Sequence, residues 1–334
     1  MALRFRLRTV PSNQCQTRTG NPSFRASAYT WCVTRRTFLL SASAAWAVPL
    51  PFPVIDTHIH LFDPNRPGGI PWPPPDDPIR SKPTYPDRFR GVASAHGVTG
   101  AVVVECSPRI EDNQWVLDIA ANDPTVAGLV GFLDAGKPEF GGQLERFAAN
   151  PVFRGIRYGN LWGRNLVDQL GNTQFISDMK HLAQRGMSLD TANPNLDLLE
   201  GMLRLSDRVP DLRMIVDHLP KIQVASSQRD RYRSILREFS ARPQTFVKIS
   251  AVLSNIEGNV SYALDDYRST IDEIMGAFGE DRVLYGSDWP NSDPLGSYDQ
   301  VIGIVQEYFA EKSSAASEKY FRLNSKAAYR WIER

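Results

Sequence analysis

Apolar runs and amphipathic stretches alternate along most of the chain. The runs with strand character, rich in β-branched and other apolar residues, are 53–62, 98–106, 126–133, 153–158, 187–190, 213–218, 246–250 and 283–288. The stretches with helical periodicity or capping residues are 113–121, 140–149, 173–185, 195–207, 229–240, 262–278 and 298–309. Apolar strands separated by helices indicate a parallel sheet that is buried on both faces.

Eight such units predict an α/β protein with a single-domain (β/α)8 TIM barrel. An open doubly wound sheet is the alternative, but no G-x-G-x-x-G or Walker-type loop follows any of the predicted strands. The active site of such a barrel lies at the carboxyl ends of its strands. Polar residues that end the apolar runs are therefore the candidates for function.

A proline-rich segment follows the first predicted strand. Residues 63–90 hold nine prolines together with Trp72, Tyr85 and Phe89. Proline lacks the backbone N–H and has a fixed φ, so we expect no regular element there. A loop of this length inside a compact domain is usually functional, and we predict a lid or a wall of the binding site. A domain linker is the alternative.

The first 47 residues differ from the rest of the chain. They include Thr34-Arg35-Arg36-Thr37-Phe38-Leu39-Leu40, a short apolar run and Ala45-Trp46-Ala47, a pattern typical of a twin-arginine export signal with its cleavage site. We expect residues 1–47 to be an extension plus signal peptide, with the biological start near Val33. Residues 48–334 are expected to form the barrel of an exported, periplasmic protein. A disordered basic tail or an anchor is the alternative, although the apolar run is shorter than the roughly 20 residues that a membrane span needs.

Composition excludes some classes of partner. The segment 1–47 holds seven arginines and no acidic residue, which leaves 31 basic against 37 acidic residues in the remainder, a net charge of −6. Without a basic block, the predicted barrel has no electrostatic reason to bind nucleic acid. Cys106 is its only cysteine, so it has no intramolecular disulfide. The oligomeric state stays open.

Two histidines end the first predicted strand. His58 and His60 are two residues apart, a spacing that places both side chains on one face of a strand. Asp56 shares their parity, while Ile55, Thr57 and Ile59 are expected to face the other layer. The pair suits a metal site or a catalytic site, or it decorates the end of a strand.

Asp288 is the most informative carboxylate. It ends an apolar run, Gly286 leaves room on the same face, and Pro290 prevents the strand from continuing. It suits a general base or a metal ligand, with a turn aspartate as the alternative. His218 shares parity with Met214 and is expected to point inward, as a functional or a buried structural histidine. The other polar strand ends are Glu105, Arg154, Arg157, Asp190, Lys248 and Ser250.

Five motifs, in this order, resemble the amidohydrolase-related (amidohydrolase 2) barrel hydrolases. They are residues 54–63 (VIDTHIHLFD), 153–158 (FRGIRY), 216–221 (VDHLPK), 247–250 (VKIS) and 284–290 (LYGSDWP). The most similar branch contains 2-pyrone-4,6-dicarboxylate lactonase and fuconolactonase-type sugar lactonases. The resemblance runs from about Pro53 to the carboxyl terminus. It implies catalytic roles for His58, His60, His218 and Asp288, and it implies that Arg154 and Arg157 bind a substrate carboxylate.

The expected reaction is hydrolysis of a small anionic lactone or carboxylate. Asp288 would take a proton from water, and the oxyanion would be stabilised by one divalent ion, Zn or Mn, on His58, His60 and Asp288, or by the imidazoles directly. Both options stay open because Tyr158 stands where relatives often have histidine. No cofactor other than this ion is predicted.

The candidates for holding an anionic substrate are cations, each with an ion pair away from the site as its alternative. They are Arg154, Arg157, Lys221 and Lys248, and Asn291 could add a hydrogen bond. Arg154 and Arg157 have opposite parity, so both reach the site only if the strand ends between them. Two other functions compete with hydrolysis: a metal-dependent decarboxylase of the same superfamily, and a non-catalytic exported binding barrel.

Overall fold

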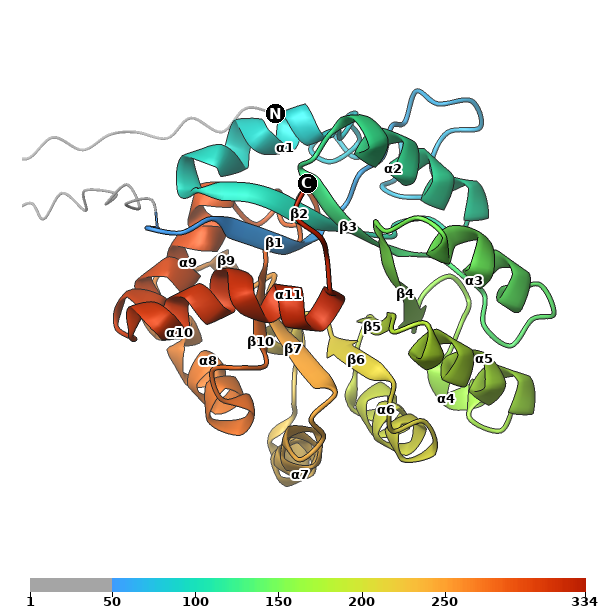
Figure 1. Cartoon of the computed structure of the whole chain (residues 1–334). Coiled ribbons are helices and arrows are strands. Elements are labelled where there is room, and N and C mark those ends of the chain that lie inside the picture. Colours follow the sequence, from blue (N-terminus) through green and yellow to red (C-terminus); the bar gives the residue numbers. More distant parts are fainter. Residues whose placement is uncertain (1–49) are drawn as a thin grey trace, which may run out of the picture. The chain divides into compact units, whose positions relative to one another are not determined.

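The computed structural model describes residues 50–334, and eight parallel strands form its centre (Figure 1). In order around the sheet these are β1 (Val54–Ile59), β2 (Val98–Val104), β3 (Val126–Gly131), β4 (Phe153–Gly159), β5 (Ser188–Ala192), β6 (Arg213–Val216), β7 (Thr245–Ser250) and β10 (Val283–Gly286). Each overlaps one predicted strand. The segment after β10 closes the ring, because Asp288 N donates to His58 O and His60 N donates to Trp289 O, both at 2.8 Å. The predicted (β/α)8 barrel is confirmed.

Helices surround the strands. The predicted ones are α2 (Ile110–Asn122), α3 (Phe140–Ala148), α5 (Thr173–Gln184), α6 (Leu196–Arg208), α7 (Arg229–Ser240), α8 (Asp265–Phe278) and α9 (Tyr298–Ala310). Those without a sequence prediction are α1 (Pro86–Ala93), α4 (Leu166–Gln169) and α10 (Ser314–Glu318), besides a hairpin of β8 (Asn255–Ile256) and β9 (Asn259–Val260). A further helix, α11 (Asn324–Tyr329), lies near the carboxyl terminus. Within the described residues, no helix has the length and apolar character needed to cross a membrane. The export signal expected in residues 1–47 lies outside them.

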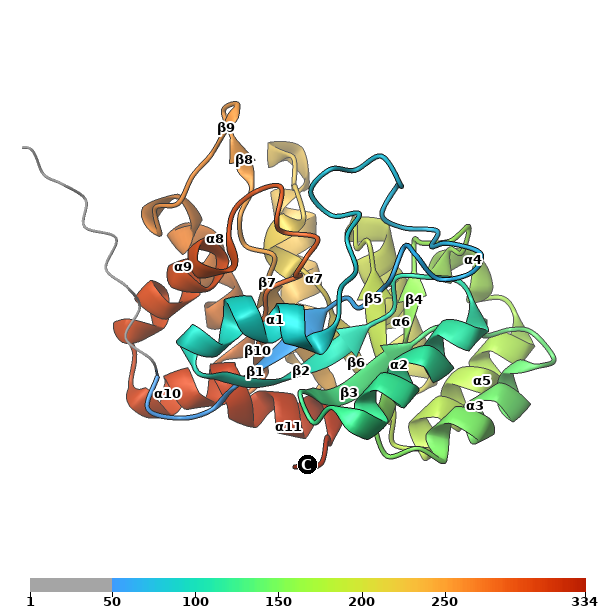
Figure 2. The same ribbon diagram turned by 90° about the horizontal axis from the view of Figure 1, so that it is seen from above.

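The proline-rich segment contains the start of a helix. The expectation of no regular element in residues 63–90 is wrong for its last five residues, where α1 begins at Pro86. Proline is tolerated at this first position because the helix needs no N–H there. Before α1, Thr84 exchanges two backbone hydrogen bonds with Phe62. Figure 2 shows the loop rising on the same side of the barrel as the β8–β9 hairpin, opposite α11.

β1 contains an irregularity that changes its side-chain parity. Asp56 pairs with Ala101 and Ile59 with Val103, so three steps along β1 match two along β2. Ile55 accordingly belongs to the interior cluster, and Asp56 accepts a hydrogen bond from Tyr298 Oη of α9 at 3.0 Å. The predicted placement of Asp56 on the face of His58 and His60 is therefore wrong, since a bulge moves the alternation by one residue.

The barrel interior is apolar at the end opposite the site. Its cluster includes Ile55, Val102 and Leu284, and the carboxyl-terminal segment adds Tyr329 and Trp331. This packing supports a layer of buried polar side chains nearer the carboxyl ends of the strands. That layer holds the candidate site.

Candidate active site

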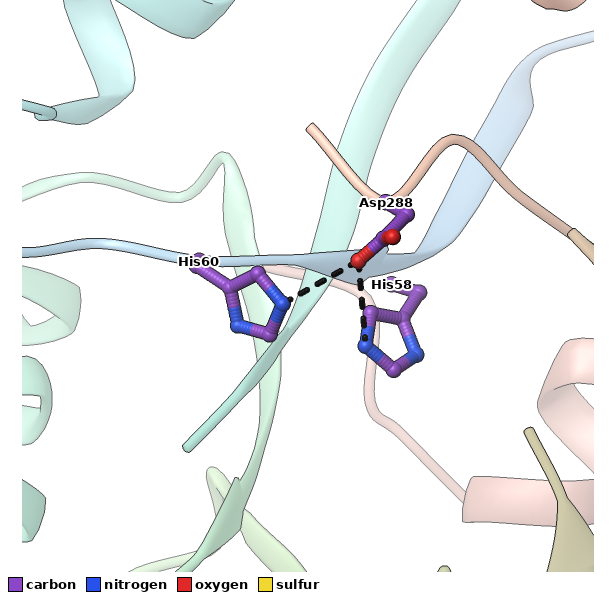
Figure 3. Close-up of side chains that lie close together, drawn as sticks. All are labelled: His58, His60 and Asp288. Carbon is purple, nitrogen blue, oxygen red and sulfur yellow. Dashed lines mark hydrogen bonds and ion pairs between the residues drawn. The ribbon is translucent and has the colours of Figure 1, made fainter. Parts of the chain in front are cut away.

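Four predicted residues meet at the carboxyl ends of the strands. His58 and His60 come from β1 and the residue that follows it, and His218 and Asp288 each follow a strand by two residues. Asp288 Oδ1 lies 3.2 Å from His60 Nε2, 3.6 Å from His218 Nε2 and 3.7 Å from His58 Nε2. Figure 3 shows both β1 imidazoles turned toward this carboxylate. One carboxylate oxygen thus faces three imidazoles in a buried setting.

The backbone at two of these residues is strained. His218 has φ 51° and Asp288 has φ 65°, both in the left-handed region that non-glycine residues rarely adopt. Such conformations persist where the surrounding structure holds them, and they cluster at functional sites. Hydrogen bonds hold the backbone beside both residues, from Asp217 N to Thr191 Oγ1 and from Asp288 N to His58 O.

Gly286 lets β10 approach His58 closely. A Cβ at this position would lie 2.9 Å from His58 Cβ and 3.2 Å from Ser250 Cβ. No side chain fits at the first of these distances without movement of the neighbours. The sequence-based expectation that Gly286 leaves room is thereby confirmed, and the residue that uses the room is His58.

The other oxygen of Asp288 is held by polar neighbours. Asp288 Oδ2 accepts a hydrogen bond from Asn291 Nδ2 at 2.8 Å and lies 3.4 Å from Lys221 Nζ. Burial alone would raise the pKa of Asp288, but its contacts with His218, Lys221 and His60 hold this pKa well below its usual range. Asp288 is therefore a carboxylate at neutral pH.

Burial, which disfavours the charged form of any group, lowers the pKa of two imidazoles. It lowers the pKa of His58 well below its ordinary value and the pKa of His218 to about 3, despite the nearby carboxylates. Both rings are therefore neutral at neutral pH. An ionised carboxylate beside neutral imidazoles is able to accept a proton.

The donor atoms fit a divalent ion. His60 Nδ1 lies 2.9 Å from Val104 O and must donate to it, which leaves Nε2, 3.2 Å from Asp288 Oδ1, as the ring nitrogen able to hold an ion. His58 Nε2 is buried and has no hydrogen-bond partner within residues 50–334. The ligand atoms of His58, His60 and Asp288 all lie within 4.8 Å of one another. Imidazole nitrogens with a carboxylate oxygen are a donor set that zinc and manganese accept.

A buried ion network supports His58 from below. Lys248 Nζ lies 2.8 Å from Asp217 Oδ1, 3.0 Å from Asp190 Oδ2 and 3.2 Å from His58 Nδ1. Asp190 also accepts a hydrogen bond from Tyr329 Oη of α11 at 2.5 Å. The expectation that Lys248 binds substrate is wrong, because its side chain is 0% exposed and lies behind His58. Lys248 instead contacts the rear nitrogen of His58 and holds the ring in place.

A cavity of about 340 Å³ opens in front of Asp288. Its lining includes six of the predicted residues, namely His60, Arg157, His218, Lys221, Asp288 and Asn291. The others are Trp72, Glu105, Cys106, Leu161, Trp162, Asn193, Pro194 and Ile222. The cavity thus combines cations, a carboxylate base and two tryptophans, a lining suited to a small polar ligand.

Only one of the two arginines of β4 lines the cavity. Arg157 lines the cavity, and its Nε donates to Thr191 O at 3.0 Å and lies 3.3 Å from Asp217 Oδ2. Arg154 is absent from the lining, and its side chain packs beside Gly128 of β3. The expectation that Arg154 reaches the substrate is wrong because β4 continues to Gly159 and does not end between the two residues.

Sequence reasoning missed two tryptophans that line the cavity. Trp162, in the loop after β4, donates from Nε1 to Glu105 Oε2 at 2.9 Å. Trp72 belongs to the proline-rich loop, and its ring centre lies 5.5 Å from that of His60. Glu105 ends a predicted strand and was already among the candidates from the sequence. The tryptophans lie in loops without periodicity, and nothing nearby in the sequence marks them.

Known proteins share sequence with this chain. A family model described as "Amidohydrolase" matches residues 55–331. An L-fucono-1,5-lactonase from Burkholderia multivorans is 25% identical over 280 residues, which cover 78% of this chain and 90% of the relative. An L-fucono-1,5-lactonase from Burkholderia ambifaria is 26% identical over 249 residues, which cover 73% of this chain and 82% of the relative.

Solved structures share the fold. A crystal structure of an amidohydrolase from Burkholderia multivorans with bound HEPES has a TM-score of 0.75 at 20% identity. A second crystal structure of a Burkholderia multivorans amidohydrolase, with bound zinc, has a TM-score of 0.72 at 21% identity. Each match covers 84% of this chain and 100% of the other.

Proposed function

The chain belongs to the amidohydrolase family, and from this premise we propose that it hydrolyses a lactone of a sugar acid or of a pyrone carboxylate. The observation that carries the proposal is the Asp288 carboxyl group, buried at the wall of a cavity of about 340 Å³, with one oxygen facing three imidazoles. The two curated relatives named as L-fucono-1,5-lactonases support a cyclic ester as the substrate.

Asp288 begins the proposed reaction as a general base. It accepts a proton from a water molecule, and the resulting hydroxide adds to the carbonyl carbon of the lactone. When the tetrahedral intermediate collapses, the ring C–O bond breaks. The protonated Asp288 then returns its proton to the departing alkoxide. The product is the open hydroxy acid, and Asp288 is again a carboxylate.

In the first of two alternatives, with no ion bound, neutral imidazoles stabilise the negative charge on the carbonyl oxygen. Lys248 Nζ faces His58 Nδ1 at 3.2 Å, and Ser250 Oγ faces His218 Nδ1 at 2.8 Å. If both neighbours donate, each neutral ring carries its hydrogen on Nε2. These two N–H groups point toward the space next to Asp288, where the oxyanion develops.

A divalent ion, zinc or manganese, is the alternative to stabilisation by the imidazoles themselves. His58 Nε2, His60 Nε2 and Asp288 Oδ1 would hold it, with the His58 Nδ1 hydrogen facing Asp217 Oδ1 at 3.5 Å. When bound, such an ion supplies a Lewis acid at the site. Elemental analysis of active, purified protein tests this alternative, and the absence of a stoichiometric divalent ion would dispose of it.

A panel of lactones tests the activity. It would include sugar-acid lactones and carboxylated pyrones, each assayed with and without a chelator. We expect base uptake and appearance of the hydroxy acid. Release of carbon dioxide from an unsaturated acid would indicate a decarboxylase instead. Tight binding of a sugar acid without any turnover would indicate a binding protein.

The two arginines of β4 offer a matched pair of variants. We expect Arg157→Met to raise the KM for a carboxylated lactone by about 10- to 100-fold, since a charge-assisted hydrogen bond is lost. Arg154→Met is the control, because Arg154 lies outside the cavity. Steady-state kinetics with carboxylated and neutral lactones measure the effect. An equal loss of affinity for both kinds of substrate would contradict a carboxylate-binding role for Arg157.

The pKa shifts predict the pH dependence of hydrolysis. The pKa of Asp288 is depressed and that of His218 is lowered to about 3, so the ionised base and the neutral imidazole coexist down to acidic pH. We expect kcat/KM to stay nearly constant from about pH 8 to about pH 5. A pH–rate profile checks this. An acid limb near the ordinary histidine pKa of about 6.5 would show that an imidazole must first lose a proton.

We propose export separately, from the Arg35-Arg36 motif, the apolar run that follows it and the Ala45-Trp46-Ala47 triplet. Amino-terminal sequencing of the protein from its native host is expected to find residue 48 as the first residue. An intact segment 1–47 in the mature protein would refute cleavage after Ala47.

A further inference from the structure

Two consecutive hydrogen bonds between side chains connect the proline-rich loop to Asp288. Arg80 Nη1 donates to Asn291 Oδ1 at 3.0 Å, and Asn291 Nδ2 donates to Asp288 Oδ2 at 2.8 Å. We propose that Arg80 is a positioning residue for the catalytic base, acting through the amide of Asn291. This inference rests on the proposed function, in which Asp288 accepts the proton of water.

Arg80 is itself held in place by Asp77. Asp77 Oδ2 accepts a hydrogen bond from Arg80 Nε at 2.7 Å, and Asp77 Oδ1 accepts from the backbone N–H groups of Ile79 and Arg80. The guanidinium is planar, so an anchored Nε also sets the direction of Nη1. The hydrogen bonds within residues 77–80 therefore hold Nη1 in the direction of Asn291.

The contact with Arg80 decides which way the Asn291 amide faces. A guanidinium only donates hydrogen bonds, so the carbonyl oxygen of the amide must face it. The amino group then faces Asp288 Oδ2. The reversed amide would place an acceptor against the carboxylate and a donor against the guanidinium, and both contacts would be repulsive. Arg80 thus keeps a donor aimed at Asp288.

The direction of this donor sets the rotation of the carboxylate. Asp288 Oδ2 is held by Asn291, so Oδ1 stays turned toward His58, His60 and His218. A base that rotates away from the attacking water loses the alignment on which proton transfer depends. The consequence of losing Arg80 should therefore appear in kcat more than in KM.

The same loop also builds the cavity wall. Trp72 lines the cavity, its ring centre lies 5.5 Å from that of His60, and the Arg80 guanidinium lies 5.7 Å from the Trp72 ring centre. The loop belongs to the face of the barrel that carries the β8–β9 hairpin (Figure 2). The loop therefore supplies both a wall of the cavity, through Trp72, and the residue that orients Asn291, through Arg80.

Four variants test the inference: Arg80→Met, Asn291→Ala, the double variant and a control, Arg66→Met. Arg66 lies in the same loop and is also 25% exposed in its side chain, with an ion pair to Asp112 at 2.8 Å. Its guanidinium stacks over Trp115, and it has no contact with Asn291. We expect Arg80→Met to lower kcat about tenfold with little change in KM, the size expected for losing one charge-assisted hydrogen bond.

The double variant carries the decisive comparison. It should be no slower than Asn291→Ala alone, because Arg80 acts only through that amide. Arg80→Lys, which keeps a donor, should recover part of kcat, and Arg66→Met should keep the full kcat. Independent, multiplying losses in the double variant would overturn the inference, as would an equal loss of kcat in Arg66→Met.

Hydrogen–deuterium exchange gives a second measurement that needs no substrate. If the link holds the loop, Arg80→Met and Asn291→Ala should both increase exchange in residues 77–84. Unchanged exchange in both variants would overturn the inference whatever the substrate proves to be. A protein that opens no lactone but shows the increased exchange would refute the proposed function and leave the link between Arg80 and Asn291 established.

Discussion

Asp288→Asn is expected to lower kcat by about a thousandfold or more while the barrel stays folded. The amide has almost the size of the carboxylate, but it cannot accept the proton of water and carries no charge toward the three imidazoles. Lactone opening measures the activity, and circular dichroism with thermal unfolding checks the fold. Near-normal turnover in a folded Asp288→Asn protein would remove Asp288 from the mechanism.

Asp293→Asn is the matched control for this experiment. Asp293 lies in the same turn, and its partner is Arg88, with Arg88 Nη2 3.5 Å from Asp293 Oδ2. It does not line the cavity in front of Asp288. The control variant should therefore hydrolyse substrate at close to the normal rate, which separates loss of the base from loss of any acidic residue in this turn.

Lys248→Met is expected to lower the free energy of unfolding by about 3–5 kcal/mol. Lys248 is fully buried, and its Nζ lies within 3.0 Å of carboxylate oxygens of both Asp190 and Asp217. Although burial would raise the pKa of Asp217, Lys248 and His58 hold this pKa well below its usual range. Methionine would leave that carboxylate charged without its main partner. Urea denaturation measures the loss.

Two further variants separate buried charge from lost packing. Lys248→Met combined with Asp217→Asn should be more stable than Lys248→Met alone, because the uncompensated charge is gone. Lys319→Met is the surface control, since Lys319 pairs with Asp281 at 2.8 Å in exposed surroundings and should cost less than about 1 kcal/mol. A loss of similar size in Lys248→Met and Lys319→Met would contradict the role of the buried network.

The hydrophobic pattern was enough to predict the barrel. Periodicity is a local property of the chain, and a strand buried on both faces keeps its apolar character whatever its neighbours are. The site followed from the same pattern, because His58, His218 and Asp288 each end a predicted strand. A closed barrel brings the carboxyl ends of its parallel strands together, so residues as distant in sequence as 58 and 288 could be assigned to the same site.

The parity of individual side chains was less predictable. The bulge in β1 reverses Asp56 relative to His58, and β4 continues past Arg157, which leaves only one of its two arginines at the cavity. Both features depend on the register between neighbouring strands. The hydrogen bonds that set this register come from segments far away in the sequence.

Contacts between distant segments decided the rest. Lys248 becomes a buried support for His58 because α11, carrying Tyr329, covers the opposite end of the barrel. Arg80 meets Asn291 across 211 positions of sequence, through a loop that has no periodic pattern. The local pattern of residues specifies which strands form and which reactive groups end them. Packing between distant segments specifies which of those groups line the cavity, because burial and hydrogen-bond partners depend on what lies against each residue.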